Sequence, residues 1–283
     1  MLAEHLYRAA CHTEYDPLHT VILCSAQYME IREVINHTQR KYADEDIDTT
    51  IANKQHEAFV QALREEGVET VILSAESQFP EQVFTRDIGF AIDDTFFVAK
   101  MARDIRQGEE TILKQWLNRH QLPFQSFEQN SIEGGDVLID GKFVWVGVSD
   151  RTTRSAVREL KRCLPNHTIK PIPFEKEYLH LDCVFNIVSP TEALIYPRAF
   201  AEESVNELAS HYDLIVVNEE EQFTLGTNVF SIGNKKLFSL PMNKKVNQEL
   251  EKRGFTVINV DISEIIKSGG SFRCITLPIL REK

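Results

Sequence analysis

Short apolar runs alternate with polar turns along most of the chain, and this pattern predicts β-hairpins. In one example an apolar run at 137–139 is followed by an Asp-Gly turn and by a second apolar run at 143–146. Asp-Gly between two apolar runs is a strong hairpin signal, because glycine readily adopts the positive φ of a tight turn. Residues 152–164 then carry apolar side chains at helical spacing, and another apolar run follows. The order strand, strand, helix, strand defines a ββαβ unit.

Two of the predicted helices have recognisable ends. Thr152 or Thr153 is a candidate N-cap for the first helix, and Asn243 is a candidate N-cap for a second helix over 244–253. The side-chain oxygens of such residues accept the free N–H groups of a first helical turn. Gly254 is expected to end the second helix, because glycine favours the left-handed conformation that terminates helices.

The unit recurs at a nearly constant interval. The first interval is 49 residues and the next three are 46 residues each, and the aligned segments begin at Asp87, Asp136, Asp182, Asn228 and Cys274. Four-stranded propeller blades and HEAT arrays have similar periods, but the former lack helices and the latter lack strands. The spacing therefore indicates a repeat of the ββαβ unit itself.

The two ends of the chain complete each other. The last copy stops after one strand at Leu280, whereas residues 19–75 read strand, helix, strand with no hairpin partner. Closing the ring removes exposed strand edges. We predict an α/β fold: a five-bladed α/β propeller of ββαβ repeats with pseudo-fivefold symmetry, forming a single catalytic domain over residues 1–283.

Composition narrows the function classes. The five cysteines are scattered without a C-x-x-C pair, which argues against a disulfide framework or a zinc cluster, and we expect neither metal nor cofactor. The formal charge of -12 disfavours nucleic acid as a partner. Residues 1–16 lack the apolar segment of a signal peptide, and no apolar run is long enough for a membrane span. We expect a cytoplasmic protein with a small-molecule partner; the sequence does not indicate an oligomeric state.

The starts of the repeats should converge near the ring axis, where polar groups are costly to bury unless they are paired or functional. Cys274 opens one repeat and His180 lies at the start of another, which suggests a thiolate and imidazole pair. For Asp136 and Asn228 we favour the role of ordinary turn residues. For Asp87 a turn role and a functional role are equally compatible with the pattern. Cys183, a rival nucleophile, is predicted to face the core, on the opposite side of a strand from Asp182.

Four motifs in this order resemble the guanidine-modifying enzyme, or pentein, superfamily: FTRD at 84–87, EGGDVL at 133–138, HLD at 180–182 and GGSFRCITLP at 269–278. This group includes arginine deiminases, dimethylarginine dimethylaminohydrolases and amidinotransferases, and its five-bladed α/β propeller agrees with the predicted ring. The resemblance implies that Cys274 is the nucleophile and His180 the general acid/base. It also implies that Glu133, Asp87 and Asp182 hold or orient a guanidinium group.

The resemblance leaves the reaction partly open. The short chain is more similar to the dimethylarginine hydrolases, and Arg106 and Arg151 fall where that subfamily has carboxylate-binding arginines, whereas FTRD and HLD are more similar to the deiminases and amidinotransferases. We expect a hydrolase that releases a ureido product such as citrulline and an amine or ammonia. The alternatives are an amidinotransferase with an amine acceptor and a non-catalytic binding ring. The polar segment 36–48 is expected to be a plain surface connection rather than a lid.

Overall fold

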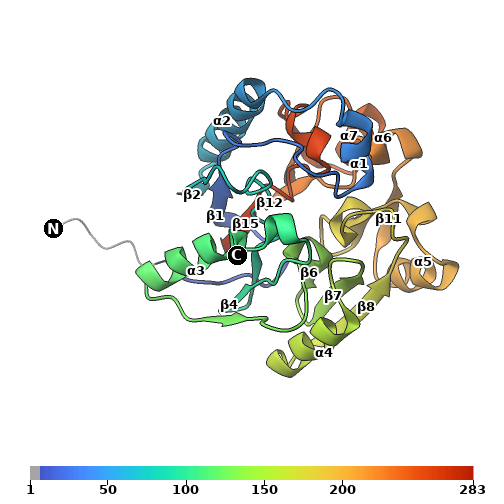
Figure 1. The fold of residues 1–283 in the computed structure, drawn as a ribbon. Coiled ribbons are helices and arrows are strands. Elements are labelled where there is room, and N and C mark those ends of the chain that lie inside the picture. The colour runs from blue at the N-terminus through green and yellow to red at the C-terminus, as the bar shows by residue number, and fades with distance from the viewer. Residues whose placement is uncertain (1–6, 283) are drawn as a thin grey trace.

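The computed structural model describes residues 7–282 as five small three-stranded sheets with helices between the strands. Figure 1 shows the helices α2, α3, α4 and α5 at the periphery and β6, β12 and β15 nearer to the middle. Residues 1–6 and 283 lie outside the described residues. All of them belong to the predicted domain, and residues 1–6 also belong to the segment searched for a signal peptide.

In each sheet the middle strand runs antiparallel to one neighbour and parallel to the other, as a ββαβ unit requires. The strands of the four continuous blades are β3 (Gly89–Ile92), β4 (Thr95–Val98) and β5 (Phe124–Ser126); β6 (Val137–Asp140), β7 (Phe143–Val148) and β8 (Thr168–Pro173); β9 (Phe185–Ile187), β10 (Glu192–Ile195) and β11 (Asp213–Val216); and β12 (Phe230–Gly233), β13 (Lys236–Ser239) and β14 (Thr256–Asn259).

The remaining blade is shared between distant parts of the chain, as predicted. Its strands are β1 (Leu18–Cys24), β2 (Glu69–Leu73) and β15 (Leu277–Arg281). Strand β1 pairs with β2 in parallel and with β15 in antiparallel orientation, and Ile22 lies opposite Leu277. The predicted fold, including the way the ring closes, is therefore confirmed.

In each blade a helix links the middle strand to the third strand. A second, short helix shares this connection in the blade of β1 and β2, and another short helix lies between two blades. The helices are α1 (His37–Tyr42), α2 (Thr49–Glu65), α3 (Glu109–Arg119), α4 (Arg154–Cys163), α5 (Glu202–Ala209), α6 (Glu219–Phe223) and α7 (Lys244–Lys252), with the 3-10 turns η1 (Asp104–Arg106), η2 (Gly134–Asp136), η3 (Leu181–Cys183), η4 (Pro197–Ala199) and η5 (Ile265–Ser268). Among the described helices none has an apolar stretch long enough to cross a bilayer.

The two predicted N-caps differ in the structure. Thr153 caps α4, and its hydroxyl accepts the N–H of Ala156. Asn243 occupies the N-cap position of α7, but its side chain bonds to Thr224 and makes no capping bond. A glutamate from α6 replaces it: Glu221 Oε1 accepts an N–H from the first turn of α7. The prediction for Asn243 was wrong because a tertiary partner competes for its amide.

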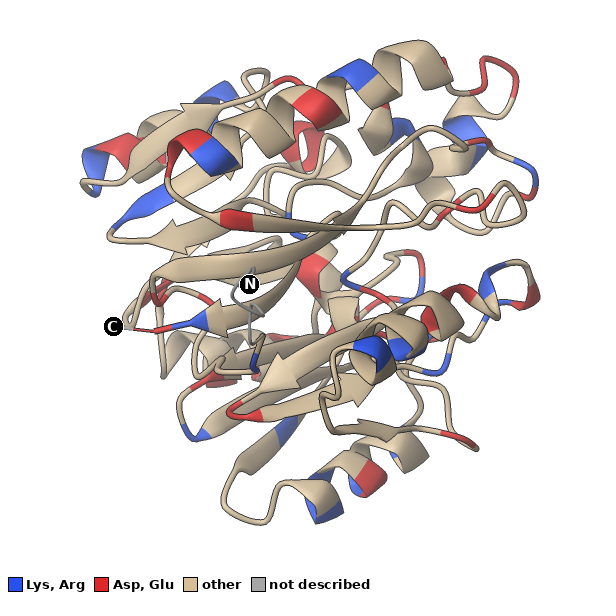
Figure 2. Ribbon diagram, turned by 90° about the vertical axis from the view of Figure 1, so that its left-hand side faces the viewer, with Lys and Arg blue, Asp and Glu red and all other residues tan. Residues whose placement is uncertain are grey.

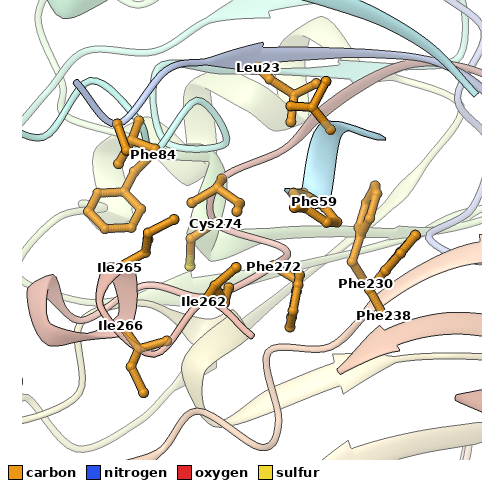
Figure 3. Packing of buried hydrophobic residues seen from close by; sticks show 14 of the residues in the cluster. Leu23, Phe59, Phe84, Phe230, Phe238, Ile262, Ile265, Ile266, Phe272 and Cys274 are labelled. Atoms are coloured by element: carbon orange, nitrogen blue, oxygen red, sulfur yellow. The ribbon is translucent and has the colours of Figure 1, made fainter. Parts of the chain in front are cut away.

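Apolar side chains form separate clusters between neighbouring blades. One cluster contains Cys274 itself, and Figure 3 shows that residue surrounded by Phe84, Ile262, Ile265 and Phe272. On the outer helices, acidic and basic residues are interspersed (Figure 2). The apolar packing thus fixes the backbone around Cys274 from several elements at once.

Candidate active site

The segments that start the repeats are joined to one another by hydrogen bonds. The N–H of Arg86 donates to the carbonyl of Cys274 at 3.0 Å, and the N–H of Gly134 donates to the carbonyl of Asp87 at 3.2 Å. The FTRD turn is therefore held between the cysteine and the EGGD segment, as the predicted convergence requires.

Asn228 and Asp136 connect the starts of different repeats through side-chain hydrogen bonds. The prediction that both are ordinary turn residues was therefore wrong. Asn228 Oδ1 accepts the N–H of Cys274 at 3.2 Å, and its Nδ2 donates to the carbonyl of Asp182 at 3.1 Å. Asp136 Oδ1 accepts the N–H of Leu181 at 2.8 Å. Both side chains bond to another blade instead of to their own backbone. The sequence signal for this role was the position of both residues at the starts of aligned repeats.

His180 and Glu133 form a buried ion pair. His180 Nε2 lies 2.7 Å from Glu133 Oε2, and Nδ1 lies 3.5 Å from Asp87 Oδ1. Burial alone would lower the pKa of His180, but the carboxylates of Asp87, Glu133 and Asp136 outweigh it and raise the pKa to about 10. Burial would raise the pKa of Glu133, and the bond to His180 lowers it instead. The pair is therefore an imidazolium and a carboxylate at neutral pH.

Two glycines of the motifs leave space for the site. A Cβ on Gly135 would lie 2.7 Å from the His180 ring and 2.9 Å from Asp87 Oδ1. A Cβ on Gly270 would lie 2.3 Å from the ring of Phe84 and 3.0 Å from Cys274 Cβ. Glycine is needed at both positions because other side chains approach the backbone closely.

The thiol of Cys274 faces a carboxylate. Its Sγ lies 3.8 and 3.7 Å from Asp182 Oδ1 and Oδ2, and both side chains are buried. Asp182 lies in η3, and His180 is the residue that precedes this turn. One short turn therefore carries both the imidazole and the carboxylate.

Two arginines anchor the two aspartates in the same manner. Arg106 Nη1 lies 2.6 Å from Asp87 Oδ2, and Arg273 Nη1 lies 2.7 Å from Asp182 Oδ2. The other oxygen of Asp87 has no hydrogen-bond partner among the described residues. Among the described residues the other oxygen of Asp182 has two thiol partners, with Cys183 Sγ at 3.6 Å and Cys274 Sγ at 3.8 Å. Each aspartate thus keeps one oxygen oriented and one oxygen able to accept a new donor.

This arrangement contradicts the prediction that Arg106 binds a substrate carboxylate. Its guanidinium is fully buried, bonds to Asp87 and to both oxygens of Glu109, and lies within 3.5 Å of two main-chain carbonyls. No face of the group remains for a ligand. Arg273 has the equivalent place beside Asp182 and was missed, although it directly precedes Cys274 in the GGSFRC motif.

Arg151 is placed differently from Arg106. It is buried, its Nη2 donates to the carbonyl of Ile35, and its Nη1 lies 3.7 Å from Glu133 Oε2. Within the described part of the chain that Nη1 has no hydrogen-bond partner. Arg151 also lines a cavity of about 290 Å³ together with Arg40 and Arg103. Its position is compatible with the predicted contact to an anionic group of a ligand.

Residues 33–37 and Arg40 line this cavity, and within the segment 36–48 Gln39 and Ile47 are buried while most other residues are exposed. Asn36 Nδ2 donates to the carbonyl of Ser268, and Gln39 Nε2 donates to Ser268 Oγ and to Glu81 at 2.6 Å. Burial raises the pKa of Glu81 to about 7, although Arg106 and the bonds from Ser268 and Gln39 oppose the shift. Polar side chains thus attach the segment to one buried cluster, in which Ser268 Oγ also donates to Glu81 at 2.9 Å.

The reactive side chains themselves are closed to solvent. Cys274 is 1% exposed, and His180, Glu133 and Asp182 are each 0% exposed. The 290 Å³ cavity lies on one side, and a second cavity of about 350 Å³ is lined by Cys183 and Gly269. Residues Asn36, His37 and 177–179 border both cavities. A ligand can therefore reach Cys274 only if this cover moves.

Cys183 belongs to an apolar core cluster, as predicted, but its side chain does not lie on the opposite face from Asp182. Residues 181–183 form a 3-10 turn instead of a strand, so neighbouring side chains do not alternate between opposite faces. The Sγ atoms of Cys183 and Cys274 and an oxygen of Asp182 all lie within 4.8 Å of one another.

Two groups of side chains have the composition of a metal site: Asp87, Glu133 and His180, and Asp182, Cys183 and Cys274. In the first, Glu133 is paired with His180 and Asp87 with Arg106. In the second, Asp182 is paired with Arg273. The carboxylate charge in both groups is therefore balanced by cationic side chains of the protein.

Comparison with known proteins assigns these features to a family. The sequence profile described as N,N dimethylarginine dimethylhydrolase, eukaryotic, matches residues 25–281. An uncharacterized protein of Bacillus subtilis, YkgA, is 50% identical over 275 residues, which cover 97% of this chain and 96% of that protein. The dimethylarginine dimethylaminohydrolase of Mycobacterium tuberculosis is 28% identical over 235 residues, which cover 82% of this chain and 77% of that protein.

A solved structure supports the fold independently. The N-terminal domain of ArgZ, an arginine dihydrolase from cyanobacteria, was crystallised as a mutant bound to substrate. It superposes with a TM-score of 0.85 at 22% identity and covers 93% of this chain and 98% of its own. The fold is therefore the five-bladed α/β propeller of the penteins.

Proposed function

Because the chain belongs to the N,N-dimethylarginine dimethylhydrolase family, we propose that it hydrolyses a guanidino C–N bond of an arginine-like substrate such as a methylated arginine. The reaction passes through a covalent adduct on Cys274 and yields a ureido product and an amine. One observation carries the proposal: the buried Cys274 thiol lies beside Asp182, and Asp182 and Asp87 are each anchored by an arginine through one oxygen and able to accept a donor through the other. Such a site fits a planar cation.

Asp87 and Asp182 are assigned to binding the guanidinium. A guanidinium presents N–H groups in a rigid fork, and hydrogen bonds between charged partners are shorter and stronger than neutral ones. Arg106 and Arg273 keep the anchored oxygens from rotating. Asp87 Oδ1 is buried without a hydrogen-bond partner in the part of the chain that the structure describes, and a substrate N–H would satisfy it.

Cys274 is assigned as nucleophile and His180 as proton donor in the first step. The thiolate attacks the central guanidino carbon, the C–N bond to the leaving amine breaks, and the amine takes a proton from the His180 imidazolium. Glu133 keeps that imidazole protonated through the 2.7 Å ion pair. The tetrahedral centre carries nitrogens and no oxyanion, so surrounding carboxylates stabilise it.

The second step reverses the proton transfer. Neutral His180 takes a proton from a water molecule that attacks the thiouronium carbon, and the C–S bond breaks to release the ureido product and the thiolate. Since the reactive side chains are at most 2% exposed, substrate and water enter when residues 33–41 move. The same enclosure keeps bulk water from the intermediate until the leaving amine departs.

Rapid-quench mass spectrometry tests this function. The intact protein is mixed with arginine, monomethylarginine, asymmetric dimethylarginine or agmatine and quenched, while ureido product and released amine are measured in parallel. We expect an adduct that maps to Cys274 and turnover of at least one compound. Absence of adduct and product with all four would contradict the proposal.

The same experiment separates hydrolysis from amidino transfer. Adding glycine, ornithine or lysine as acceptor should leave the yield of ureido product unchanged if water resolves the adduct. Diversion of the amidino group into a new guanidino compound would instead identify a transferase with the same nucleophile.

Arg151→Gln should raise KM for an arginine-derived substrate by about 10- to 100-fold and should change kcat much less. The basis is the Nη1 of Arg151, which lines the cavity with no hydrogen-bond partner among the described residues. A bond to a charged group contributes about 1.5–3 kcal/mol, and each 1.4 kcal/mol corresponds to about tenfold in affinity.

The decarboxylated analogue agmatine is the control for Arg151→Gln, since it lacks the carboxylate and its KM should not rise. Arg103→Gln is the matched variant, because it removes another arginine from the wall of the same cavity. An equal rise in KM for both compounds would show that Arg151 acts on the guanidino end instead, through Glu133.

A further inference from the structure

Cys183 lies beside the nucleophile proposed above. The two Sγ atoms are within 4.8 Å of each other, and both side chains are at most 2% exposed. The Asp182 carboxylate borders both thiols, with Oδ1 3.6 Å from Cys183 Sγ and 3.8 Å from Cys274 Sγ. No step of the proposed hydrolysis uses Cys183.

We propose that Cys183 and Cys274 form a reversible disulfide when the protein reacts with a hydroperoxide. A disulfide requires the sulfurs to approach to about 2.05 Å. Rotation of the two side chains about their Cα–Cβ bonds moves the sulfurs over the remaining gap. The pair is thus a modification site built into the nucleophile's own surroundings.

The oxidation proceeds in two balanced steps. The Cys274 thiolate attacks one oxygen of hydrogen peroxide, the O–O bond breaks, and sulfenic acid and hydroxide are formed. The Cys183 sulfur then attacks the sulfenic sulfur, an S–S bond replaces the S–O bond, and water leaves with the proton of the Cys183 thiol. The two sulfurs together lose two electrons, which peroxide accepts.

The surroundings of Cys183 suit the second step. Contact with the Cys274 sulfur, burial and the Asp182 carboxylate raise the pKa of Cys183 well above its ordinary value, so it remains a thiol until Cys274 is oxidised. Asp182 Oδ1, at 3.6 Å, is the nearest acceptor for its proton. Cys183 therefore does not compete as first nucleophile, and its assignment as the resolving sulfur rests on its position within 4.8 Å of Cys274 Sγ.

One member of this pair lies at the wall of a cavity. Cys183 lines the 350 Å³ cavity, whose wall also includes Lys41 and Arg198. The cavity volume exceeds that of a peroxide molecule. The remaining cysteines pack elsewhere: Cys11 and Cys24 belong to one apolar cluster, and Cys163 packs against another. Within the described residues Cys183 and Cys274 are thus the pair placed to combine.

Intact mass spectrometry tests the disulfide without reference to enzymatic activity. The reduced protein is treated with a few equivalents of hydrogen peroxide, denatured in an alkylating reagent and digested. We expect a loss of about 2 Da, one linked peptide that joins Cys183 to Cys274, and full reversal by dithiothreitol. In Cys183→Ser and Cys183→Ala the loss should be absent, and Cys274 should gain about 16 or 32 Da instead.

Cys274→Ser is the reciprocal variant, and Cys163→Ser is the matched control that keeps the linkage. Oxygen addition in the wild type with no loss of about 2 Da, or linkage that persists in Cys183→Ala, overturns the proposal. The functional consequence rests on the proposed function: peroxide should lower turnover at least tenfold, with recovery in dithiothreitol. Linkage without loss of turnover would leave the disulfide established and remove Cys274 as nucleophile.

Discussion

Cys274→Ser should lower turnover of any guanidino substrate by about 10⁴-fold or more, because a serine hydroxyl is a far weaker nucleophile toward a resonance-stabilised cation. The backbone around residue 274 should be unaffected, since its hydrogen bonds do not involve the thiol. The N–H of residue 274 donates to Asn228 Oδ1, and its carbonyl accepts the N–H of Arg86. Steady-state assays of ureido product, together with the quenched mass spectrum, measure the loss. Substrate binding should persist within about tenfold because both anchored aspartates remain.

Cys163→Ser is the control, as this cysteine lies on α4 and packs against a different apolar cluster. It should turn over substrate like the wild type. Product formation by Cys274→Ser within tenfold of the wild type would mean that another group attacks the substrate. Since Cys183 is the nearest thiol, the double variant would then identify it.

Glu133→Gln should shift the alkaline limb of the kcat/KM profile by at least one pH unit toward neutral pH and lower activity near pH 8 by about 100-fold. In the wild type the pKa of His180 is raised to about 10. The imidazolium therefore survives through the physiological range and is lost only above it. Glu133→Gln removes one of the carboxylates that raise the pKa of His180, so the imidazolium loses its proton at a lower pH than in the wild type.

The same change has a signature in stability. A pKa raised in the folded state contributes stability that is fully present below the ordinary value of 6.5 and is lost as pH rises through about 10. Urea unfolding of the wild type should therefore show a decline between about pH 7 and 10 that is smaller in Glu133→Gln. Glu128→Gln, an exposed carboxylate in the preceding loop, is the control. Identical pH profiles for wild type and Glu133→Gln would remove Glu133 from the proton-donating pair.

The fold was accessible from the sequence because its information is local and repeated. Each hairpin has its own turn chemistry, and a constant interval shows that the units are equivalent. The strand, helix, strand pattern at 19–75 lacked a hairpin partner, so ring closure followed by the need to cover strand edges. The register of the repeat starts also predicted that Cys274 and His180 converge near the ring axis.

Side-chain partners across blades were not accessible in the same way. Arg106 was expected to bind a ligand, yet its role depends on Asp87 from another element and on Glu109 three residues away. Asn228 is a residue type that is common in turns. Only the position of the Cys274 N–H shows that the side-chain amide of Asn228 supports the backbone of the cysteine. The core position predicted for Cys183 is confirmed, but its side chain lies beside Asp182, because alternation holds for strands and not for a 3-10 turn.

The pairing of β1 with β15 makes folding and activity a single event. Leu18 and Arg281 face each other across the seam, so this contact has one of the largest sequence separations that the ring contains. Contacts of such high order form late and slow the overall rate. On a ribosome, β15 is made after every other described strand, and Cys274 lies three residues before it. A nascent chain thus lacks Cys274, the proposed nucleophile, until shortly before the last described strand of the ring is made.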